Sequence, residues 1–430
     1  MKTMIVVILI CMLLLFLLKV PVYISMALTG CALMMATSGM KWSILTQYLY
    51  TGTNSFTLLA IPLFLLAAKL MNTGGITKKL FAFCMKVVGW LPGGLGHVNI
   101  LSSVIFAGMS GTAVSDAGGL GAIEIKAMNE NGFDNDFSCC VTAASSTMGP
   151  IIPPSIPLVV YATVSGASVG ALFMAGIVPG IVMALLMMVV VTIYAIKRHY
   201  PRTKFPTFHE FGHALKEGFL PLMAPIILLV GIYGGVFTPT ESAAIVVLYS
   251  LFLDVVVYRE LSLKKFIAIL KETVRDSLTI ALIIAGATFF GYVATRAKIP
   301  QMILTSMTSV VSSKVTLLLI INVFLLIVGC FLETASAITI VVPLILPLLT
   351  AYNINLTQFG IIMVLNLMIG LLTPPFGLVL FVISKIGHIS IGRFSRALVP
   401  WLGALLAALL LVTFIPQLSL WFPTMLGMSV

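Results

Sequence analysis

Long apolar runs follow one another along most of the chain, separated by short polar segments. They lie near residues 4–19, 21–37, 54–71, 137–165, 168–196, 219–236, 239–258, 275–295, 357–384 and 398–415. About 20 apolar residues in a row are enough for an α-helix to cross the hydrocarbon core of a bilayer. The runs therefore predict an all-α polytopic membrane protein that crosses the bilayer about ten times.

Glycine and paired prolines interrupt two of these runs. The interruptions are GPIIPP from Gly149 to Pro154 and GLLTPP from Gly370 to Pro375. In hydrocarbon, an unpaired backbone N–H or C=O costs several kcal/mol, so an unwound segment persists only where it lines a cavity or binds something. Glycine and proline can also simply kink helices and let them pack closely. A pair of breaks of one design favours two broken helices at a transport site.

Two further regions, residues 95–127 and 317–349, are apolar at both ends and polar in the middle. Their small and polar central segments are Ser110–Asp116 and Glu333–Ser336. A helical hairpin that enters the membrane and returns on the same side has this pattern, because its tip is irregular backbone at membrane depth. The sequence therefore predicts two re-entrant helical hairpins.

The breaks and the hairpins repeat in the two halves of the chain. Thr112 precedes Gly149 by nearly the same separation as Thr334 precedes Gly370, which indicates internal repeats. Each half is predicted to hold scaffold helices, a hairpin, a broken helix and a closing helix. The predicted division is scaffold helices over 1–71, arm, hairpin 1, broken helix and closing helix over 72–196, a cytoplasmic loop over 197–218, second scaffold helices over 219–295, and arm, hairpin 2, broken helix and closing helix over 296–430.

Charge predicts the orientation of these repeats. Basic residues fill the loops 197–216 and 259–275, which should be cytoplasmic, whereas the turn 238–241 has no Lys or Arg and should lie outside. Followed outward from these loops, hairpin 1 enters from the cytoplasm and hairpin 2 from outside, so the repeats are inverted in topology. The net charge of +11 is explained in this way, and nucleic-acid binding is not indicated.

Composition and small motifs exclude several other classes. With 60% hydrophobic and 9% charged residues, no soluble domain of useful size remains. The six cysteines form no C-x-x-C pair, so neither a disulfide framework nor a zinc ribbon is indicated. The apolar run after Lys2 resembles a signal peptide but lacks a small-x-small cleavage pattern, so we expect a retained first helix. No P-loop is present, so transport must be driven by a gradient or by another subunit.

Both hairpin tips and both breaks supply oxygen atoms that suit a sodium ion, because hydroxyls and unwound carbonyls are ligands for hard cations. Two sodium sites are predicted. Site 1 comprises Ser110, Thr112, Gly149, Ile152 and Pro154. Site 2 comprises Thr334, Ala335, Gly370, Thr373 and Pro375.

Charged residues near the tips are candidates for substrate or ion coupling. Asp116 and Glu333 are costly in hydrocarbon and are functional candidates for that reason, unless the tips face an aqueous cavity. Arg296 ends a predicted helix, where it could grip a carboxylate with two hydrogen bonds or simply extend to the membrane interface.

One motif favours a different function. His209 to His213 match H-E-x-x-H, in which two histidines hold zinc and the glutamate acts as base. This predicts an intramembrane metalloprotease as a remote alternative. The motif lies in a basic loop after two prolines with no evident third ligand, so a short interfacial helix is the favoured interpretation and no zinc site is expected at His209 and His213.

The segments Ser110–Asp116, Gly149–Ser155 and Leu372–Gly377 resemble the large membrane subunit of tripartite ATP-independent periplasmic (TRAP) transporters, over essentially the whole chain. The resemblance implies an elevator-type secondary transporter of the bacterial inner membrane. It implies co-transport of sodium with an organic acid, such as sialic acid or a C4-dicarboxylate. It also makes Asp116, Arg296, Glu333 and Ser155 candidates for substrate or coupling contacts, Glu333 for ion coupling or tip structure first.

The resemblance also implies partners. A periplasmic substrate-binding protein delivers the acid in this family, and a small four-helix membrane subunit is required, which we expect on a separate chain. A self-sufficient sodium/dicarboxylate carrier of similar architecture is the alternative, and dependence on a binding protein separates the two.

Overall fold

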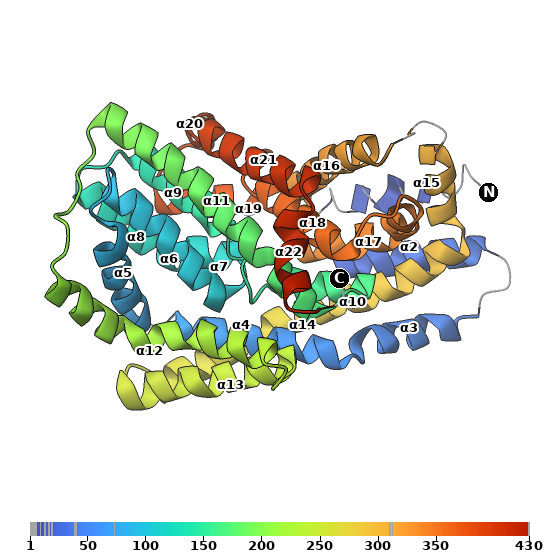
Figure 1. Ribbon diagram of the computed structural model, residues 1–430. Helices are drawn as coiled ribbons and strands as arrows, with labels where there is room; N and C mark the ends of the chain where they lie inside the picture. Colours follow the sequence, from blue (N-terminus) through green and yellow to red (C-terminus); the bar gives the residue numbers. More distant parts are fainter. Residues whose placement is uncertain are drawn as a thin grey trace.

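The computed structural model describes residues 7, 8, 10–12, 14, 15, 18, 20–37, 41–72, 74–308, 311 and 313–428, without the side chains of 57, 74, 75 and 108–110. Throughout these residues the regular secondary structure is helical (Figure 1). Six of the described helices are long and apolar enough to cross a membrane, or up to nine spans if each bent pair counts as one. The chain is an all-α polytopic membrane protein. Half of the residues of the predicted first helix, near 4–19, lie outside the described residues.

The first helices of the chain differ in part from the predicted runs. They are α2 (Val22–Ala36), α3 (Ser43–Thr53), α4 (Ala60–Met71) and α5 (Gly74–Val88). The helix α3 was not predicted, because Thr46, Gln47 and Thr51 interrupt its apolar pattern. The Thr46 and Thr51 hydroxyls instead donate to the carbonyls of Ser43 and Gln47 within the helix, so these residues are compatible with it.

Hairpin 1 is present where the sequence predicts it. Helix α6 (Gly94–Ser110) leads in, and α7 (Ala113–Gly118) and α8 (Leu120–Glu130) lead back. The chain reverses at Gly111, whose φ of +61° lies in the left-handed region that favours glycine, and at Thr112, which is extended. The small polar tip is therefore a tight turn between two helical arms.

The first broken helix follows directly. Helix α9 (Asn135–Ser146) ends at an irregular segment, here called break 1 (residues 147–155), and helix α10 (Ile156–Ser165) continues beyond it. Ser155 caps α10 by accepting a hydrogen bond of 3.2 Å from the Leu158 amide. The closing helix α11 (Val169–Arg198) completes the repeat.

The second half begins with helices longer than the predicted runs. They are α12 (Phe208–Tyr233), α13 (Pro239–Phe252), which continues as a π-turn over Leu253–Val257, α14 (Leu263–Arg296) and α15 (Ile299–Thr308). Helix α14 begins well before the predicted 275–295 because Ser262 caps it, accepting from the Lys265 amide at 3.3 Å. The first turns of α14 are polar, so hydropathy alone predicts a helix that is too short.

Hairpin 2 and the second broken helix repeat the order of the first half. Hairpin 2 consists of α16 (Lys314–Phe331) and α17 (Thr334–Ala351), and α18 (Leu356–Gly370) and α19 (Leu378–Ile386) flank break 2 (residues 371–377). The chain ends with α20 (Ile391–Ala397), α21 (Val399–Phe414) and α22 (Gln417–Met425). Both breaks contain a cis Pro-Pro bond, at Pro153-Pro154 and Pro374-Pro375.

The two hairpins lie in opposite halves of the molecule and meet near its centre (Figure 1). Helix α10 packs on α17, and α7 packs on α19, so the returning arm of each hairpin contacts the second half of the other repeat's broken helix. Helix α18 lies at the centre of this unit, with every residue from Thr357 to Gly370 buried. The inverted repeats thus share one core.

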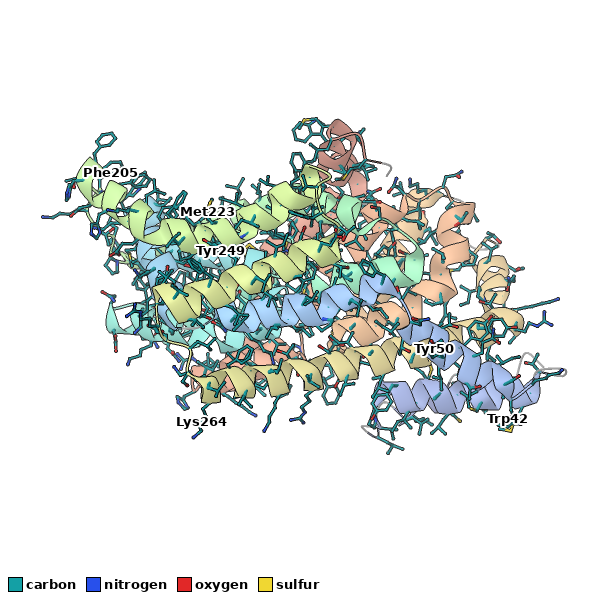
Figure 2. The ribbon with its side chains drawn as sticks, turned by 90° about the horizontal axis from the view of Figure 1, so that it is seen from below. Trp42, Tyr50, Phe205, Met223, Tyr249 and Lys264 are labelled. Atoms are coloured by element: carbon teal, nitrogen blue, oxygen red, sulfur yellow. The ribbon has the colours of Figure 1, made fainter. Side chains whose placement is uncertain are left out.

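A layer of long helices covers one side of this core. In the order α12, α13, α4, α14, α3, each helix packs on the next, and Figure 2 shows α4 between α13 and α14. Lys69 on α4 forms ion pairs with Glu272 at 3.3 Å and Asp276 at 2.6 Å on α14. This layer therefore has links of its own that do not involve the hairpins.

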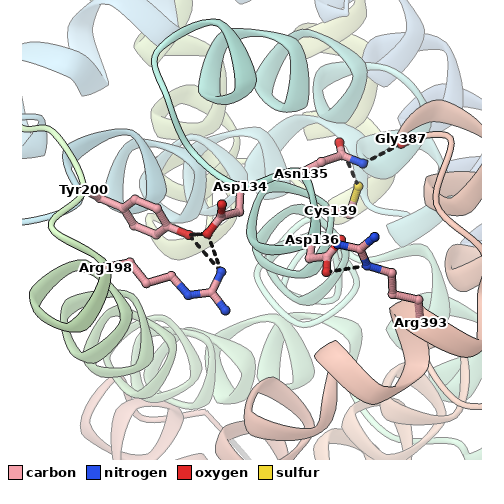
Figure 3. A network of polar contacts seen from close by, with 8 residues as sticks. All are labelled: Asp134, Asn135, Asp136, Cys139, Arg198, Tyr200, Gly387 and Arg393. Atoms are coloured by element: carbon pink, nitrogen blue, oxygen red, sulfur yellow. Dashed lines mark hydrogen bonds and ion pairs between the residues drawn. The ribbon is translucent and has the colours of Figure 1, made fainter.

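Polar contacts fix the turn between hairpin 1 and α9 (Figure 3). Asp134 accepts hydrogen bonds from the Tyr200 hydroxyl at 2.6 Å and from Arg198, beside the end of α11. Asp136 accepts from the Arg393 Nε at 2.8 Å on α20. The start of α9 is therefore joined to two other elements at this end of the molecule.

Candidate functional site

The tip of hairpin 1 lies against break 1. A Cβ atom at Gly111 would come within 2.9 Å of the Pro154 carbonyl oxygen, so the two backbones are in direct contact. Break 1 is buried, apart from the half-buried Ile152. Helix α11 packs behind it, since a Cβ at Gly176 would meet the Ile151 carbonyl oxygen at 2.1 Å. Break 1 is therefore held between a hairpin tip and a glycine surface of α11.

Break 1 leaves carbonyl oxygens free for a ligand. Among the described residues, no donor bonds to the carbonyls of Gly149, Ile152 or Pro154. The half-buried Thr112 begins α7 without a side-chain capping bond. The Ser110 side chain, also predicted for site 1, lies outside the described residues. Buried carbonyls without donors are suited to a hard cation.

Ser155 has a structural partner inside the break. Its hydroxyl donates to the Pro150 carbonyl and accepts from the Leu158 amide, and its side chain is buried. The Ser155 hydroxyl thus bridges the backbone of break 1 and caps α10. These two hydrogen bonds explain the position of the side chain without a substrate.

At hairpin 2, the end of α16 lies against break 2 and the end of α18. A Cβ at Gly370 would lie 2.4 Å from the Gly329 carbonyl carbon, so α16 and α18 cross at two glycines. The next residue of the tip, Cys330, lies with its Sγ 3.4 Å from the Thr373 hydroxyl. One position further on, the rings of Phe331 and Phe376 lie with centroids 5.9 Å apart. The last residues of α16 are therefore joined by three successive contacts to the end of α18 and to break 2.

The oxygens of site 2 are engaged within the break. The Thr373 hydroxyl donates to the Ile369 and Gly370 carbonyls, both at 2.9 Å. The Gly370 carbonyl also accepts from the Thr373 amide at 3.0 Å. Thr334 and Ala335 are buried in the first turn of α17, whereas Pro375 is exposed. Site 2 thus offers fewer free oxygens than site 1.

Glu333 caps the helix that follows the second tip. Its Oε2 accepts from the Ser336 amide at 3.2 Å, as an N-cap carboxylate does. Arg296 ends α14 with an exposed side chain, and no hydrogen bond or ion pair joins it to the other residues that the structure describes. These two candidates therefore lie in different settings, and only Glu333 belongs to a hairpin tip.

The H-E-x-x-H glutamate takes part in a capping box. Thr207 and Glu210 exchange side-chain and backbone hydrogen bonds of 3.2 and 3.3 Å at the start of α12, and Lys86 lies 3.4 Å from the Glu210 carboxylate. In the described part of the chain, no group of three or more His, Cys, Asp or Glu side chains could hold a metal ion.

The structure adds a polar link in each repeat that the sequence analysis missed. Ser145 donates to the Asn99 side chain at 2.7 Å, and Asn366 donates to the Asn322 side chain at 2.6 Å. Each link joins the first arm of a hairpin to the broken helix within the last two turns before its break. The signal was available, because asparagine in an apolar helix is costly unless it finds a partner.

A buried carboxylate also went unnoticed. Glu124 on α8 is 1% exposed and accepts from the Asn99 Nδ2 at 2.7 Å. It lies near the end of the region 95–127, where an acid inside the membrane is by itself a functional signal.

Comparison with known proteins places this architecture in a family. Residues 9–418 match the family model described as "Tripartite ATP-independent periplasmic transporter, DctM component". The chain belongs to the DctM family. As a DctM-family protein it is a transporter permease and not an enzyme, and it is an integral protein of the inner membrane.

The names of several relatives of this DctM-family chain include a substrate. It is 42% identical to the sialic acid TRAP transporter large permease SiaM of Vibrio cholerae, over 94% of each chain. It is 36% identical to the C4-dicarboxylate permease DctM of the same organism, over 95% of this chain and 94% of that one. It is 38% identical to the sialic acid permease SiaT of Haemophilus influenzae, over 90% of this chain but 63% of SiaT.

A solved structure supports the fold of this DctM-family chain. The YdaH transporter of Alcanivorax borkumensis matches with a TM-score of 0.63, over 93% of this chain and 97% of that chain, at 13% identity. At this identity the likeness concerns the fold alone.

Proposed function

We propose that this permease takes up an organic acid of the sialic acid or C4-dicarboxylate class together with sodium ions, and that a periplasmic binding protein delivers the acid. The names of relatives support the substrate class, since they include sialic acid, C4-dicarboxylate and 2,3-diketo-L-gulonate permeases. All of these substrates are small organic anions. Family membership supports the binding protein and the small membrane subunit as partners.

The observation that carries sodium coupling is the position of break 1. The donor-free carbonyls of Gly149, Ile152 and Pro154 belong to a buried segment that touches the tip of hairpin 1. A sodium ion that bridges tip and break would satisfy these oxygens, and it would be co-transported substrate. An anion could then approach a site whose charge the ion has made more positive.

An elevator motion is part of the proposal. The hairpins and broken helices interlock across the repeats through α10 with α17 and α7 with α19, so they are suited to move as one body. The layer α12–α13–α4–α14–α3 is held by its own ion pairs at Lys69 and could serve as the fixed scaffold. Motion of one repeat unit against another is the usual basis of alternating access.

The test is uptake of labelled sialic acid and of succinate into proteoliposomes that hold this chain and its small membrane subunit. We expect uptake of one acid that requires an inward sodium gradient and its binding protein. Sodium-driven uptake without any binding protein would instead establish a self-sufficient carrier. Uptake that is unchanged when sodium is replaced by potassium would refute sodium coupling.

A further inference from the structure

Helix α14 is longer than a membrane span. Its 34 residues rise about 51 Å, whereas the hydrocarbon core of a bilayer is about 30 Å thick. Residues 277–295 contain no Asp, Glu, Lys or Arg, and at about 28 Å they are long enough to cross this core. The charged residues lie before them, at Lys264, Lys265, Lys271, Glu272, Arg275 and Asp276. The headgroup layer of the membrane therefore begins near Asp276, at the end of α14 that is predicted to be cytoplasmic.

Two cations in this headgroup layer have no acid paired with them. Lys271 and Arg275 are exposed and lie one turn apart on the same face of α14. The acids that follow them in sequence, Glu272 and Asp276, pair with Lys69 on α4 instead. The ion pairs among the described residues include neither Lys271 nor Arg275. Two like charges one turn apart repel each other, so an anion bound between them would stabilise this part of the helix.

The same face of α14 is apolar and exposed within the membrane span. Leu278 is 58% exposed and Leu282 is 45% exposed. With Lys271 and Arg275 they lie at positions i, i+4, i+7 and i+11, which share one face of a helix. In Figure 2, α14 runs along the edge of the molecule from Lys264 at its outer end. One lipid acyl chain could therefore lie along this face, directly after a headgroup at Arg275.

This face leads to an apolar groove of about 300 Å³ between α2, α3 and α14. Leu282 and Gly286 line the groove from α14, Tyr23 lines it from α2, and Leu49 lines it from α3. From Arg275 to Gly286 the helix rises about 16 Å, which is about half the thickness of the hydrocarbon core. The groove thus lies at the depth that an acyl chain of the cytoplasmic leaflet reaches.

An anionic phospholipid matches both parts of this face. Its phosphate would accept charge-assisted hydrogen bonds from Lys271 and Arg275, and its acyl chain would cover Leu278 and Leu282. A small soluble anion would meet the two cations but leave the groove and the apolar side chains uncovered. A lipid with no net charge would fill the groove but would not offset the repulsion between the cations.

We propose that Lys271, Arg275, Leu278, Leu282 and the groove beside them form a binding site for one anionic phospholipid of the cytoplasmic leaflet. Helices α2 and α3 both pack on α14, so a lipid in the groove contacts all three. The lipid would fix the proposed scaffold to one leaflet while the hairpins move. Lipid binding of this kind does not depend on sodium coupling or on the identity of the transported acid.

The test uses the full chain, purified with its small membrane subunit and placed in phosphatidylcholine nanodiscs. A photoactivatable phosphatidylglycerol with a diazirine in its acyl chain is added, and the labelled residues are mapped by mass spectrometry. We expect labels within residues 278–286. The double variant Lys271→Gln with Arg275→Gln should reduce this labelling at least about fivefold, because each cation near the surface contributes about 1 kcal/mol to binding of anionic lipid.

The matched control is the double variant Lys126→Gln with Lys385→Gln, which removes two exposed basic side chains from other helices. It lowers the net charge by the same amount and should leave the labelling of residues 278–286 unchanged. An equal loss in the control would refute the site, because general attraction of anionic lipid to the basic side of the protein would then explain the labels.

The wild type alone also tests the proposal, so the result does not depend on how the variants fold. Photoactivatable phosphatidylcholine should label residues 278–286 at least about fivefold less than phosphatidylglycerol does. Equal labelling by the two lipids, or no label on this face, would refute the site. Labels that appear only when the small membrane subunit is omitted would show that this subunit covers the face, and they would overturn the assignment to a lipid.

Discussion

The two hairpin tips share one architecture but differ in chemistry. Break 1 is buried and leaves the carbonyls of Gly149, Ile152 and Pro154 without donors from the described chain. Break 2 exposes Pro374 to Phe376 and engages the Gly370 carbonyl with its own Thr373. The inverted symmetry therefore sets where the two breaks lie, whereas the side chains around each break decide how open it is to a ligand.

The acids differ in the same way. Hairpin 1 buries Asp116 and Glu124 with free oxygens, while Glu333 in hairpin 2 is used to cap α17. The contrast teaches that a duplicated fold need not duplicate its ion chemistry. We expect ion binding to depend more on hairpin 1, and packing between tip and break to depend more on hairpin 2.

The largest expected effect is on the packing of hairpin 2. In Gly370→Ala the new Cβ would lie 2.4 Å from the Gly329 carbonyl carbon, and neither backbone can move aside cheaply. We expect a loss of at least about 3 kcal/mol in the free energy of unfolding. Gly111→Ala should cost less, about 2 kcal/mol, because its left-handed φ of +61° is combined with a milder contact, 2.9 Å from the new Cβ to the Pro154 carbonyl oxygen.

Unfolding by SDS in mixed micelles would measure both variants. Gly403→Ala is the control, because nothing lies within 4 Å of its Cβ position on α21. Replacing this helical glycine should be neutral or stabilising. Equal losses in Gly370→Ala and Gly111→Ala would contradict the idea that hairpin 2 is the more tightly packed tip.

The next effect concerns the asparagine of each hairpin. Asn99→Ala would leave Glu124 Oε2 without its donor, whereas the Ser145 hydroxyl keeps its bonds to Ser103 and to the Thr142 carbonyl. We expect a loss of about 2–3 kcal/mol, because the group left without a partner is a carboxyl. Asn322→Ala would leave the neutral Asn366 Nδ2 without its acceptor, whereas the Thr413 hydroxyl still donates to the Leu409 carbonyl, so we expect a smaller loss of about 1–2 kcal/mol. The same SDS titration measures both. A larger loss in Asn322→Ala would reverse the predicted order of the two hairpins.

The outline of this molecule could be predicted from its sequence, because glycine and proline in apolar runs have few other uses. The hairpin tips at Gly111 and Glu333 and both breaks lie where the pattern predicts them. The ends of the helices could be predicted less well from the sequence. Helices α12 and α14 begin earlier than their apolar runs, because capping at Thr207 and Ser262 extends them into polar sequence.

The partners of polar side chains could not be predicted in the same way. Asn99 bonds to Glu124, Thr142 and Ser145, and these contacts appear only when α6, α8 and α9 are folded against one another. Whether a carboxylate caps a helix, as Glu333 does, or is left unpaired, as Asp116 is, depends likewise on the folded neighbours. Sequence indicates that an intramembrane acid matters, but not in which role.

The two predicted sodium sites can be compared by removing one threonine hydroxyl from each. Thr112→Ala should raise the sodium concentration for half-maximal uptake about tenfold, because its hydroxyl has no competing partner among the described residues. Thr373→Ala should raise it only about threefold, because its hydroxyl already serves two carbonyls. Substrate affinity at saturating sodium should change less in both variants.

Sodium titration of uptake in proteoliposomes measures this pair. Thr163→Ala is the control, because its hydroxyl bonds to the Val159 carbonyl within α10 at 2.9 Å, outside the break. An unchanged sodium titration in both Thr112→Ala and Thr373→Ala would remove these two residues from the predicted ligand sets.

The smallest expected effect is a difference in acid sensitivity between α9 and α18, the first halves of the two broken helices. Tyr200 and then Arg198 hold the pKa of Asp134 below its usual range, so the contact stabilises the start of α9 above the ordinary aspartate pKa and is lost as pH falls through the lowered one. Asn355 caps α18 without a charge, accepting from the Thr357 amide at 2.9 Å. Asp134 is partly exposed, so the stabilisation should be below about 1 kcal/mol.

Hydrogen exchange resolved by mass spectrometry, corrected for the intrinsic pH dependence of amide exchange, can separate the two helices. Acidification into the range where Asp134 becomes protonated should speed exchange in the first turn of α9 and leave the first turn of α18 unchanged. In Asp134→Asn the α9 turn should exchange at the faster rate already at neutral pH, with no further acid step. If α18 loosened to the same extent as α9, the acid response would be a property of the whole fold and not of the charged contact in Figure 3.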